Sequence, residues 1–80
     1  MKLSQIIYKI HKQIESKELQ SIPQKEMAKR LGISLSTYTE WLRDANQPIA
    51  MRAILDMLTM LNDEDIIHTI RTWEHNKDKN

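Results

Sequence analysis

The sequence predicts a small all-α fold, and two observations indicate it. Apolar residues recur at intervals of three and four along most of the chain, which is the period of an amphipathic helix. The 80 residues include one glycine, two prolines and no phenylalanine, and helix-forming Leu, Ile, Met, Lys, Glu and Gln are abundant. Because a chain this short buries only about 60% of its unfolded surface, we expect one compact domain over residues 1–75 and a frayed polar tail over residues 76–80.

The first two helices are expected over residues 3–16 and 23–31. The first has an apolar stripe at helical spacing, made of Leu3, Ile6, Ile7, Ile10 and Ile14. The second begins with Pro23, since proline suits a first helical turn, and Ser21 and Gln24 have the spacing of a capping box. Gly32 is a natural end to this helix, and three of its residues are expected to face inward: Met27, Ala28 and Leu31.

Three further helices are expected over residues 35–43, 48–61 and about 63–74. Ser34 can cap the first of these, and its buried face is predicted to contain Tyr38, Trp41 and Leu42. The next helix has one narrow polar stripe, made of Arg52, Asp56 and Thr59, so most of its surface must be covered. Asn62 or Asp63 can cap the last helix, whose apolar stripe is Ile66, Ile67, Ile70 and Trp73.

Charge is distributed unevenly along the chain. Residues 1–52 hold nine Lys and Arg against five Asp and Glu, whereas residues 53–80 hold three against six. This asymmetry suits one face attracted to phosphate and another turned away from it, although a solvated surface with uneven charge is about as common. The chain has no cysteine and no apolar run of about 20 residues, so we expect a cytoplasmic protein that does not span a membrane.

Enzymatic activity is not expected from this sequence. The three histidines, His11, His68 and His75, share no metal-ligand spacing, and no nucleophile lies beside a plausible base. We therefore expect surface or half-buried histidines, no metal, no cofactor and no small-molecule ligand.

The segment from Pro23 to Arg43, PQKEMAKRLGISLSTYTEWLR, is the strongest functional signal. Ala28 is small where two helices would cross closely, and Gly32 can adopt the left-handed conformation of a tight turn. With Tyr38 and Trp41 facing inward, the second helix of this pair presents one outward face, made of Ser36, Thr39, Glu40 and Arg43.

This segment resembles the Cro/CI-type, or XRE, family of helix-turn-helix repressors. The resemblance covers about residues 3–62 and is most specific in a series of small, apolar and polar positions: Gln24, Ala28, Leu31, Gly32, Ile33 and Ser34, followed by Thr37, Tyr38 and Trp41. It implies a five-helix, lambda-repressor-like domain with a helix-turn-helix over residues 23–43, whose third helix enters the major groove.

Taken residue by residue, the resemblance implies contact with double-stranded DNA. Thr39 and Arg43 are the best candidates for base contacts, because threonine offers a hydroxyl and a methyl group and arginine can bind guanine with two hydrogen bonds. Gln24 either binds a phosphate or caps its helix, and Ser34 either caps its helix or contacts DNA. The full set of candidates is Gln24, Lys25, Ser34, Leu35, Ser36, Thr37, Thr39, Glu40, Arg43, Asn46, Gln47 and Arg52.

Three positions depart from the family pattern. Leu35 replaces a frequent glutamine and could touch a thymine methyl group or turn into the core, and we favour the core. Glu40 stands where a basic or polar residue is usual, so it must accept a hydrogen bond from cytosine or pair with a cation. Asp44 replaces a common glycine, so the loop that holds Asn46 and Gln47 is expected to differ in shape, and both side chains could reach the DNA backbone.

The resemblance further implies a homodimeric repressor of its own operon that binds an inverted-repeat operator. A single domain of this size makes too few base contacts to select one genomic site. We expect the dimerisation helices within residues 48–74, with a candidate interface of Met51, Leu55, Ile66, Ile70 and Trp73, although these residues could equally form intramolecular core. The alternative is an antitoxin-like module that sequesters a partner protein through its surplus apolar surface.

Overall fold

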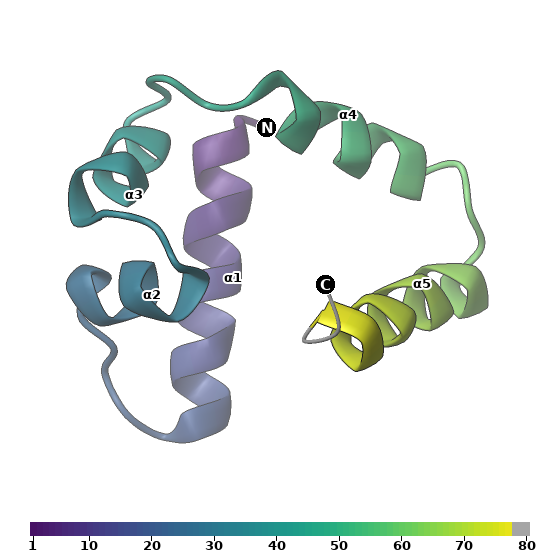
Figure 1. The fold of residues 1–80 in the computed structure, drawn as a ribbon, viewed down its shortest axis with the longest axis horizontal. Coiled ribbons are helices and arrows are strands. Elements are labelled where there is room, and N and C mark those ends of the chain that lie inside the picture. Colours follow the sequence, from purple (N-terminus) through teal and green to yellow (C-terminus); the bar gives the residue numbers. More distant parts are fainter. Residues whose placement is uncertain (78–80) are drawn as a thin grey trace. The chain divides into compact units, whose positions relative to one another are not determined.

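The structure is a computed structural model that describes residues 1–77, and these residues form five α-helices and no strand. In chain order the helices are α1 (Leu3–Glu18), α2 (Gln24–Leu31), α3 (Leu35–Leu42), α4 (Ile49–Leu58) and α5 (Asp63–Asn76) (Figure 1). The predicted all-α class and the number of helices are confirmed for this part of the chain. The chain divides into two compact units, the first over Met1–Pro48 and the second beginning at Ile49.

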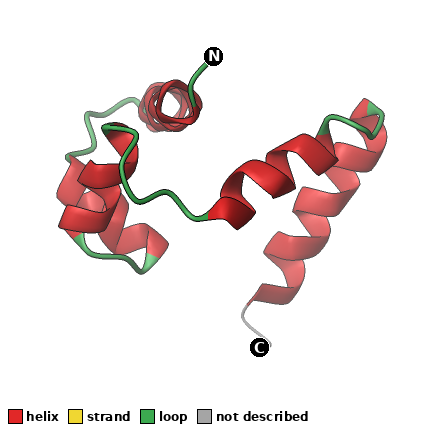
Figure 2. Cartoon of the chain, turned by 90° about the horizontal axis from the view of Figure 1, so that it is seen from above, coloured by secondary structure: helices red, strands yellow, loops and turns green. Residues whose placement is uncertain are grey.

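The first unit contains α1, α2 and α3, and it holds the buried core. Figures 1 and 2 both show the short helices α2 and α3 beside the longer α1. The core consists of Ile22, Met27, Ala28 and Tyr38, packed by half-buried Ile7, Ile14, Ile33, Trp41 and Leu42. The predicted inward positions of Met27, Ala28 and Tyr38 are therefore confirmed.

Two apolar residues that were expected in this core are exposed instead. Ile10 is 47% exposed and Leu31 is 55% exposed. The buried face of α1 contains Leu3 and His11, with Ile7 and Ile14 packed against the core, so Ile10 falls beside that face. Leu31 is the last residue of α2, a helix of eight residues whose buried side chains are Met27 and Ala28.

Several helix ends differ from the sequence prediction. Pro23 occupies the N-cap position of α2, and the capping box predicted for Ser21 and Gln24 is wrong, because the Ser21 hydroxyl donates to the Glu15 carboxylate at 3.5 Å instead. Helix α1 continues to Glu18, and α4 ends at Leu58 in a turn over residues 59–61. Of the tail predicted over residues 76–80, Asn76 still belongs to α5, and residues 78–80 lie outside the described part.

Two predicted caps and the predicted stop at Gly32 are confirmed. The Ser34 hydroxyl accepts a hydrogen bond from the Thr37 amide at 3.1 Å, and the Asn62 side chain accepts one from the Asp65 amide at 2.8 Å. Gly32 has φ +74°, and a Cβ placed there would meet nothing within 4 Å. The left-handed backbone, rather than a lack of space, therefore explains the glycine.

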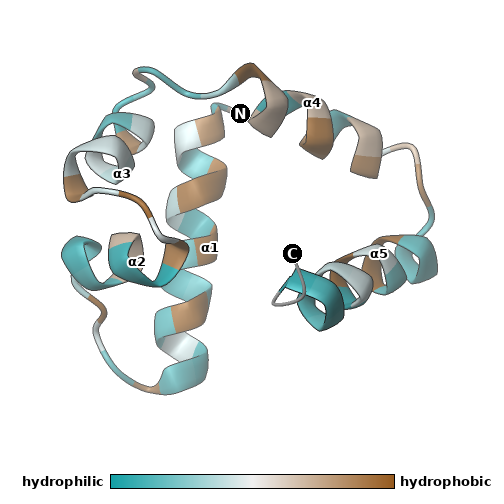
Figure 3. Ribbon diagram, viewed as in Figure 1, coloured by the Kyte–Doolittle hydropathy of each residue, from teal (hydrophilic) through white to brown (hydrophobic). Residues whose placement is uncertain are grey.

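The second unit contains α4 and α5 and has no fully buried side chain among its described residues. Met51, Leu55, Leu58 and Ile66 are half-buried, and Figure 3 shows hydrophobic stretches along α4. Large apolar residues that remain exposed are Ile49, Ile54, Met57, Met60, Leu61, Ile67, Ile70 and Trp73. The sequence predicts that most of the surface of α4 is covered, and the second unit alone does not cover it.

None of the described helices is long and apolar enough to cross a membrane.

Candidate functional site

The candidate site centres on α3, which has one anchored side and one open side. Tyr38 is 2% exposed, and the half-buried Trp41 and Leu42 pack beside it. The open side contains exposed Leu35, Ser36 and Arg43 and half-buried Thr39 and Glu40. The outward face predicted from helical spacing is thus present, although Thr39 and Glu40 are partly covered.

The side chain of Leu35 corrects one expectation. Leu35 is 44% exposed, so it does not turn into the core as we favoured. It occupies the first position of α3, where the chain has just left the turn and the core side chain of this helix is Tyr38, three residues later. An exposed leucine at the start of α3 is available for apolar contact.

The hydroxyl groups at the start of α3 bond to one another. Besides capping the helix, the Ser34 hydroxyl lies 2.8 Å from the Thr37 hydroxyl and 3.2 Å from that of Ser36. Further along, the Thr39 hydroxyl donates to the Leu35 carbonyl at 2.8 Å. This bond fixes the rotamer of Thr39 and leaves its oxygen free to accept a further hydrogen bond.

Side chains of the loop after α3 hold that loop in place. Asn46 donates from its amide to the Glu40 carboxylate at 2.9 Å, and Gln47 donates to the Trp41 carbonyl at 2.8 Å. Glu40 on α3 is thus paired with a neutral amide in the loop that follows this helix. Two residues that we expected to reach outward, Asn46 and Gln47, are engaged within the chain.

Asp44 adopts the backbone conformation for which the family pattern has a glycine at this position. Its φ is +61°, the left-handed conformation in which glycine is usual, and aspartate is one of the residues that tolerate it. The Asp44 carboxylate accepts a hydrogen bond from the Ser4 amide at 3.4 Å and lies 3.9 Å from the Lys2 amine. Hydrogen bonding from Ser4 and the charge of Lys2 hold the pKa of Asp44 below its ordinary value. The loop is thereby tied to the first turn of α1.

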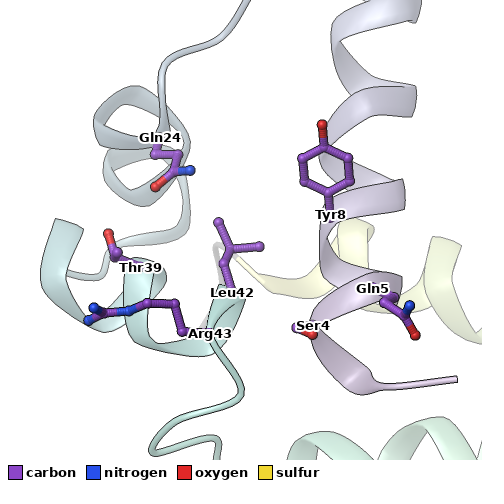
Figure 4. A pocket seen from close by; sticks show the side chains of 7 residues that line it. All are labelled: Ser4, Gln5, Tyr8, Gln24, Thr39, Leu42 and Arg43. Atoms are coloured by element: carbon purple, nitrogen blue, oxygen red, sulfur yellow. The ribbon is translucent and has the colours of Figure 1, made fainter.

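A hollow with a volume of about 490 Å³ lies beside α3. Its lining residues are Ser4, Gln5, Tyr8, Gln24, Thr39, Leu42 and Arg43, and none of them is acidic (Figure 4). In Figure 4, Gln24 and Thr39 lie across from Tyr8, with Leu42 between them. Three predicted residues, Gln24, Thr39 and Arg43, are therefore brought to one place.

The hollow also contains residues that the sequence interpretation missed. Ser4, Gln5 and Tyr8 lie on α1, 15 or more residues before the predicted motif, and their spacing gives no functional signal. Lys25 is exposed on α2 and does not line the hollow. Arg52 is exposed on α4 and does not line the hollow.

The largest departure from the sequence prediction is His11, which we expected at or near the surface. It is 6% exposed, its Nδ1 lies 2.8 Å from the Tyr38 hydroxyl, and its Nε2 lies 2.8 Å from the Ile22 carbonyl oxygen. The rings of His11 and Tyr38 are stacked, with centroids 5.8 Å apart. Burial raises the pKa of Tyr38 above its ordinary value. Because the partners of His11 are 11 and 27 residues away, no local pattern could have indicated this cluster.

Two glutamates on α1 connect this helix to its neighbours. The Glu15 carboxylate accepts a hydrogen bond from the Ile22 amide at 2.6 Å and lies 3.0 Å from the Lys12 amine. These contacts, led by the Ile22 amide, lower the pKa of Glu15. Glu18 accepts two hydrogen bonds from the Arg30 guanidinium, at 2.6 and 2.9 Å, and they lower its pKa as well.

We expect the first unit to lose stability as the pH falls below about 5. The pKa values of Glu15, Glu18 and Asp44 are lower in the folded chain than their ordinary values. Their stabilising contribution is therefore complete above about pH 5 and disappears as the pH falls through the folded-state values. Urea midpoints measured between pH 5.5 and 2.5 should decrease steadily, and Glu15→Gln should flatten this dependence more than Glu64→Gln on α5. A midpoint that stays constant over this range would contradict the assignment.

The structure also places the residues that could bind a metal ion and the candidate dimer residues. In residues 1–77, no three His, Cys, Asp or Glu side chains lie together so as to hold a metal ion. Of the candidate dimer residues, Met51, Leu55 and Ile66 are half-buried, and Ile70 and Trp73 are 47% and 63% exposed.

Comparisons of the chain with protein-family models, curated proteins and solved structures found no match.

Proposed function

We propose that the chain is a sequence-specific, double-stranded DNA-binding transcriptional regulator. In this proposal α2 and α3 form the helix-turn-helix of a five-helix, lambda-repressor-like fold, and α3 enters the major groove. The observation that supports it best is the two-sided character of α3, with Tyr38 buried and Ser36 and Arg43 exposed on the other side. A major groove about 12 Å wide admits one helix, and base edges are read by side chains of this kind.

The proposed roles follow from the environment of each side chain. Arg43 is exposed and has no carboxylate partner in the described residues, so its guanidinium can bind a guanine edge. Thr39 accepts from the amino group of a base, and exposed Leu35 contacts a thymine methyl group. Glu40 accepts from a cytosine amine through the oxygen that Asn46 does not occupy.

The remaining contacts are proposed to be with the DNA backbone. Gln24 and Lys25 at the start of α2 bind phosphate, and the hydroxyl groups of Ser34, Ser36 and Thr37 lie at the start of α3, where phosphate contacts are common. Asn46 and Gln47 act by shaping the loop that follows α3. Arg52 on α4 adds electrostatic attraction.

We further propose that the protein acts as a homodimer that represses its own operon. One domain of this size buries too little DNA surface for high specificity, so two copies on an inverted repeat are needed. The proposed interface contains Met51, Leu55, Ile66, Ile70 and Trp73. Its support is the apolar surface that α4 and α5 leave exposed within the second unit.

The same apolar surface favours a second candidate function. An antitoxin-like protein would use it to sequester a partner protein, and eight large apolar residues are exposed over Ile49–Trp73. The two candidates differ in what the isolated protein does, because only the regulator binds DNA in the absence of a partner.

Selection from a pool of random duplexes tests the proposal. Purified protein should enrich an inverted repeat whose half-sites lie about one helical turn, roughly 34–36 Å, apart. Light scattering of the protein on the enriched duplex should give the mass of two copies. Failure to enrich any motif, with a mass of one copy at all concentrations, would favour the protein-interaction function instead.

A further inference from the structure

The hollow beside α3 has two walls that come from different helices. Gln24 and Thr39 on α2 and α3 form one wall, and Ser4, Gln5 and Tyr8 on α1 form the other (Figure 4). The proposed function uses the first wall, since Gln24 is assigned to a phosphate and Thr39 to a base. It leaves the wall on α1 without a role.

The wall on α1 offers neutral hydrogen-bond donors. Tyr8 is 55% exposed, and its phenol hydroxyl can donate. The Gln5 side-chain oxygen accepts a hydrogen bond from the Lys2 amide at 2.7 Å, so the amino group of Gln5 is the part of that side chain left to donate to a ligand. This wall can therefore bind an acceptor without contributing a charge of its own.

Contacts within α1 hold the ring of Tyr8 in place. The Lys12 amine lies 5.3 Å from the ring centroid, a distance typical of a cation–π contact. The same amine lies 3.0 Å from the Glu15 carboxylate, which accepts a hydrogen bond from the Ile22 amide at 2.6 Å. The ring is thus oriented before a ligand arrives, and a pre-oriented donor loses little conformational entropy on binding.

The lining of the hollow favours an anion. Its one charged residue is Arg43, and none of its residues is acidic. The hydroxyl of Tyr8 and the side-chain amides of Gln5 and Gln24 can all donate to the same ligand. The volume of about 490 Å³ lies within the range of about 300–1,000 Å³ for clefts that hold small molecules, so a phosphate group with its sugar can enter. Tyr and Gln side chains are among those that bond to phosphate oxygens in protein–DNA complexes.

The hollow adjoins the side chains that are proposed to read bases. Thr39 and Arg43 line it, and both belong to the open side of α3. A helix in the major groove has a DNA strand on each side of it. A strand that lies beside α3 and reaches Gln24 therefore passes over the hollow and faces the wall on α1.

We propose that a phosphate of this DNA strand binds over the hollow and accepts a hydrogen bond from the Tyr8 hydroxyl, with Gln5 and Gln24 as further donors. This inference rests on the proposed function, and it adds α1 to the elements that contact DNA. Because Tyr8 is neutral, its contact strengthens binding without releasing a counterion from the DNA.

Tyr8→Phe tests the contact, since it removes the hydroxyl and retains the ring. Fluorescence anisotropy should show about 5-fold weaker binding to the duplex enriched by selection and to its scrambled counterpart, because both contain the phosphate. The slope of log affinity against log salt should equal that of the wild type, whereas Lys25→Ala should lower it by about 1. The control is Gln13→Ala, at an exposed position of α1 that does not line the hollow, and it should leave affinity unchanged.

Replacement of single phosphates of the enriched duplex by uncharged methylphosphonates locates the contact. At one phosphate in each half-site the replacement should cost the wild type at least about 3-fold more affinity than it costs Tyr8→Phe, and the two costs should be equal elsewhere. Equal costs at every phosphate, unchanged affinity of Tyr8→Phe, a loss confined to the enriched duplex, or a lower salt slope would overturn the inference. If the wild type enriches no duplex, the proposed function itself fails. If the wild type has a sequence preference and Tyr8→Phe binds equally well, only the contact on α1 is refuted.

Discussion

Tyr38→Ala is expected to lower the free energy of unfolding of the first unit by about 3–5 kcal/mol, the range for a buried aromatic side chain. Tyr38 is 2% exposed, it belongs to the core with Ile22, Met27 and Ala28, and its hydroxyl is the partner of His11 Nδ1. Removal of the ring leaves a cavity and an unsatisfied buried nitrogen. Since small domains have total stabilities near the lower end of about 5–15 kcal/mol, most of the variant should be unfolded at 37 °C.

The matched control is Tyr8→Ala, because the chain has two tyrosines and Tyr8 is 55% exposed. The Lys12 amine lies 5.3 Å from the centroid of its ring, and exposed contacts of this kind contribute at most about 1 kcal/mol. Urea denaturation followed by circular dichroism measures both variants. Equal midpoints for Tyr38→Ala and Tyr8→Ala would contradict the assignment of Tyr38 to the core.

Arg43→Ala is expected to reduce affinity for the specific duplex by about 1–3 kcal/mol, which corresponds to roughly 5-fold to 150-fold. The reason is the proposed contact of its guanidinium with a guanine edge. Binding to a scrambled duplex should weaken much less, because that binding depends on phosphate charge. Anisotropy titrations of the variant against both duplexes measure the difference.

Lys25→Ala is the matched control, since it removes one exposed cation from α2 rather than from α3. It should weaken both duplexes to a similar extent and lower the slope of log affinity against log salt by about 1. Equal losses on the two duplexes for Arg43→Ala would make Arg43 a phosphate contact. A loss confined to the specific duplex for Lys25→Ala would place Lys25 against a base.

Local patterns predicted much of the fold. Helical periodicity predicted the five helices. The caps Ser34 and Asn62 and the stop at Gly32 define helix ends, and each acts through a hydrogen bond or a backbone angle within four residues. The buried positions of Met27, Ala28 and Tyr38 follow from the same periodicity. These features are predictable because the interactions that cause them lie within one or two helical turns.

Features that depend on distant residues were not predictable. His11 is buried by partners at positions 22 and 38, and Asp44 bonds to Ser4, forty residues earlier in the chain. Leu35 matches an apolar core residue by type, but the geometry of the turn places it outside. The hollow beside α3 likewise combines residues from three helices, and only Gln24, Thr39 and Arg43 belong to the predicted set.

Binding to DNA with a sequence preference is the central claim, and one titration tests it most directly. Fluorescence anisotropy of the wild-type chain should be measured on the duplex enriched by selection and on its scrambled counterpart, at 50 mM and 200 mM salt. We expect affinity for both to fall with salt, and affinity for the enriched duplex to stay at least about 10³-fold higher. Equal affinities for the two duplexes at both salt concentrations would contradict the claim.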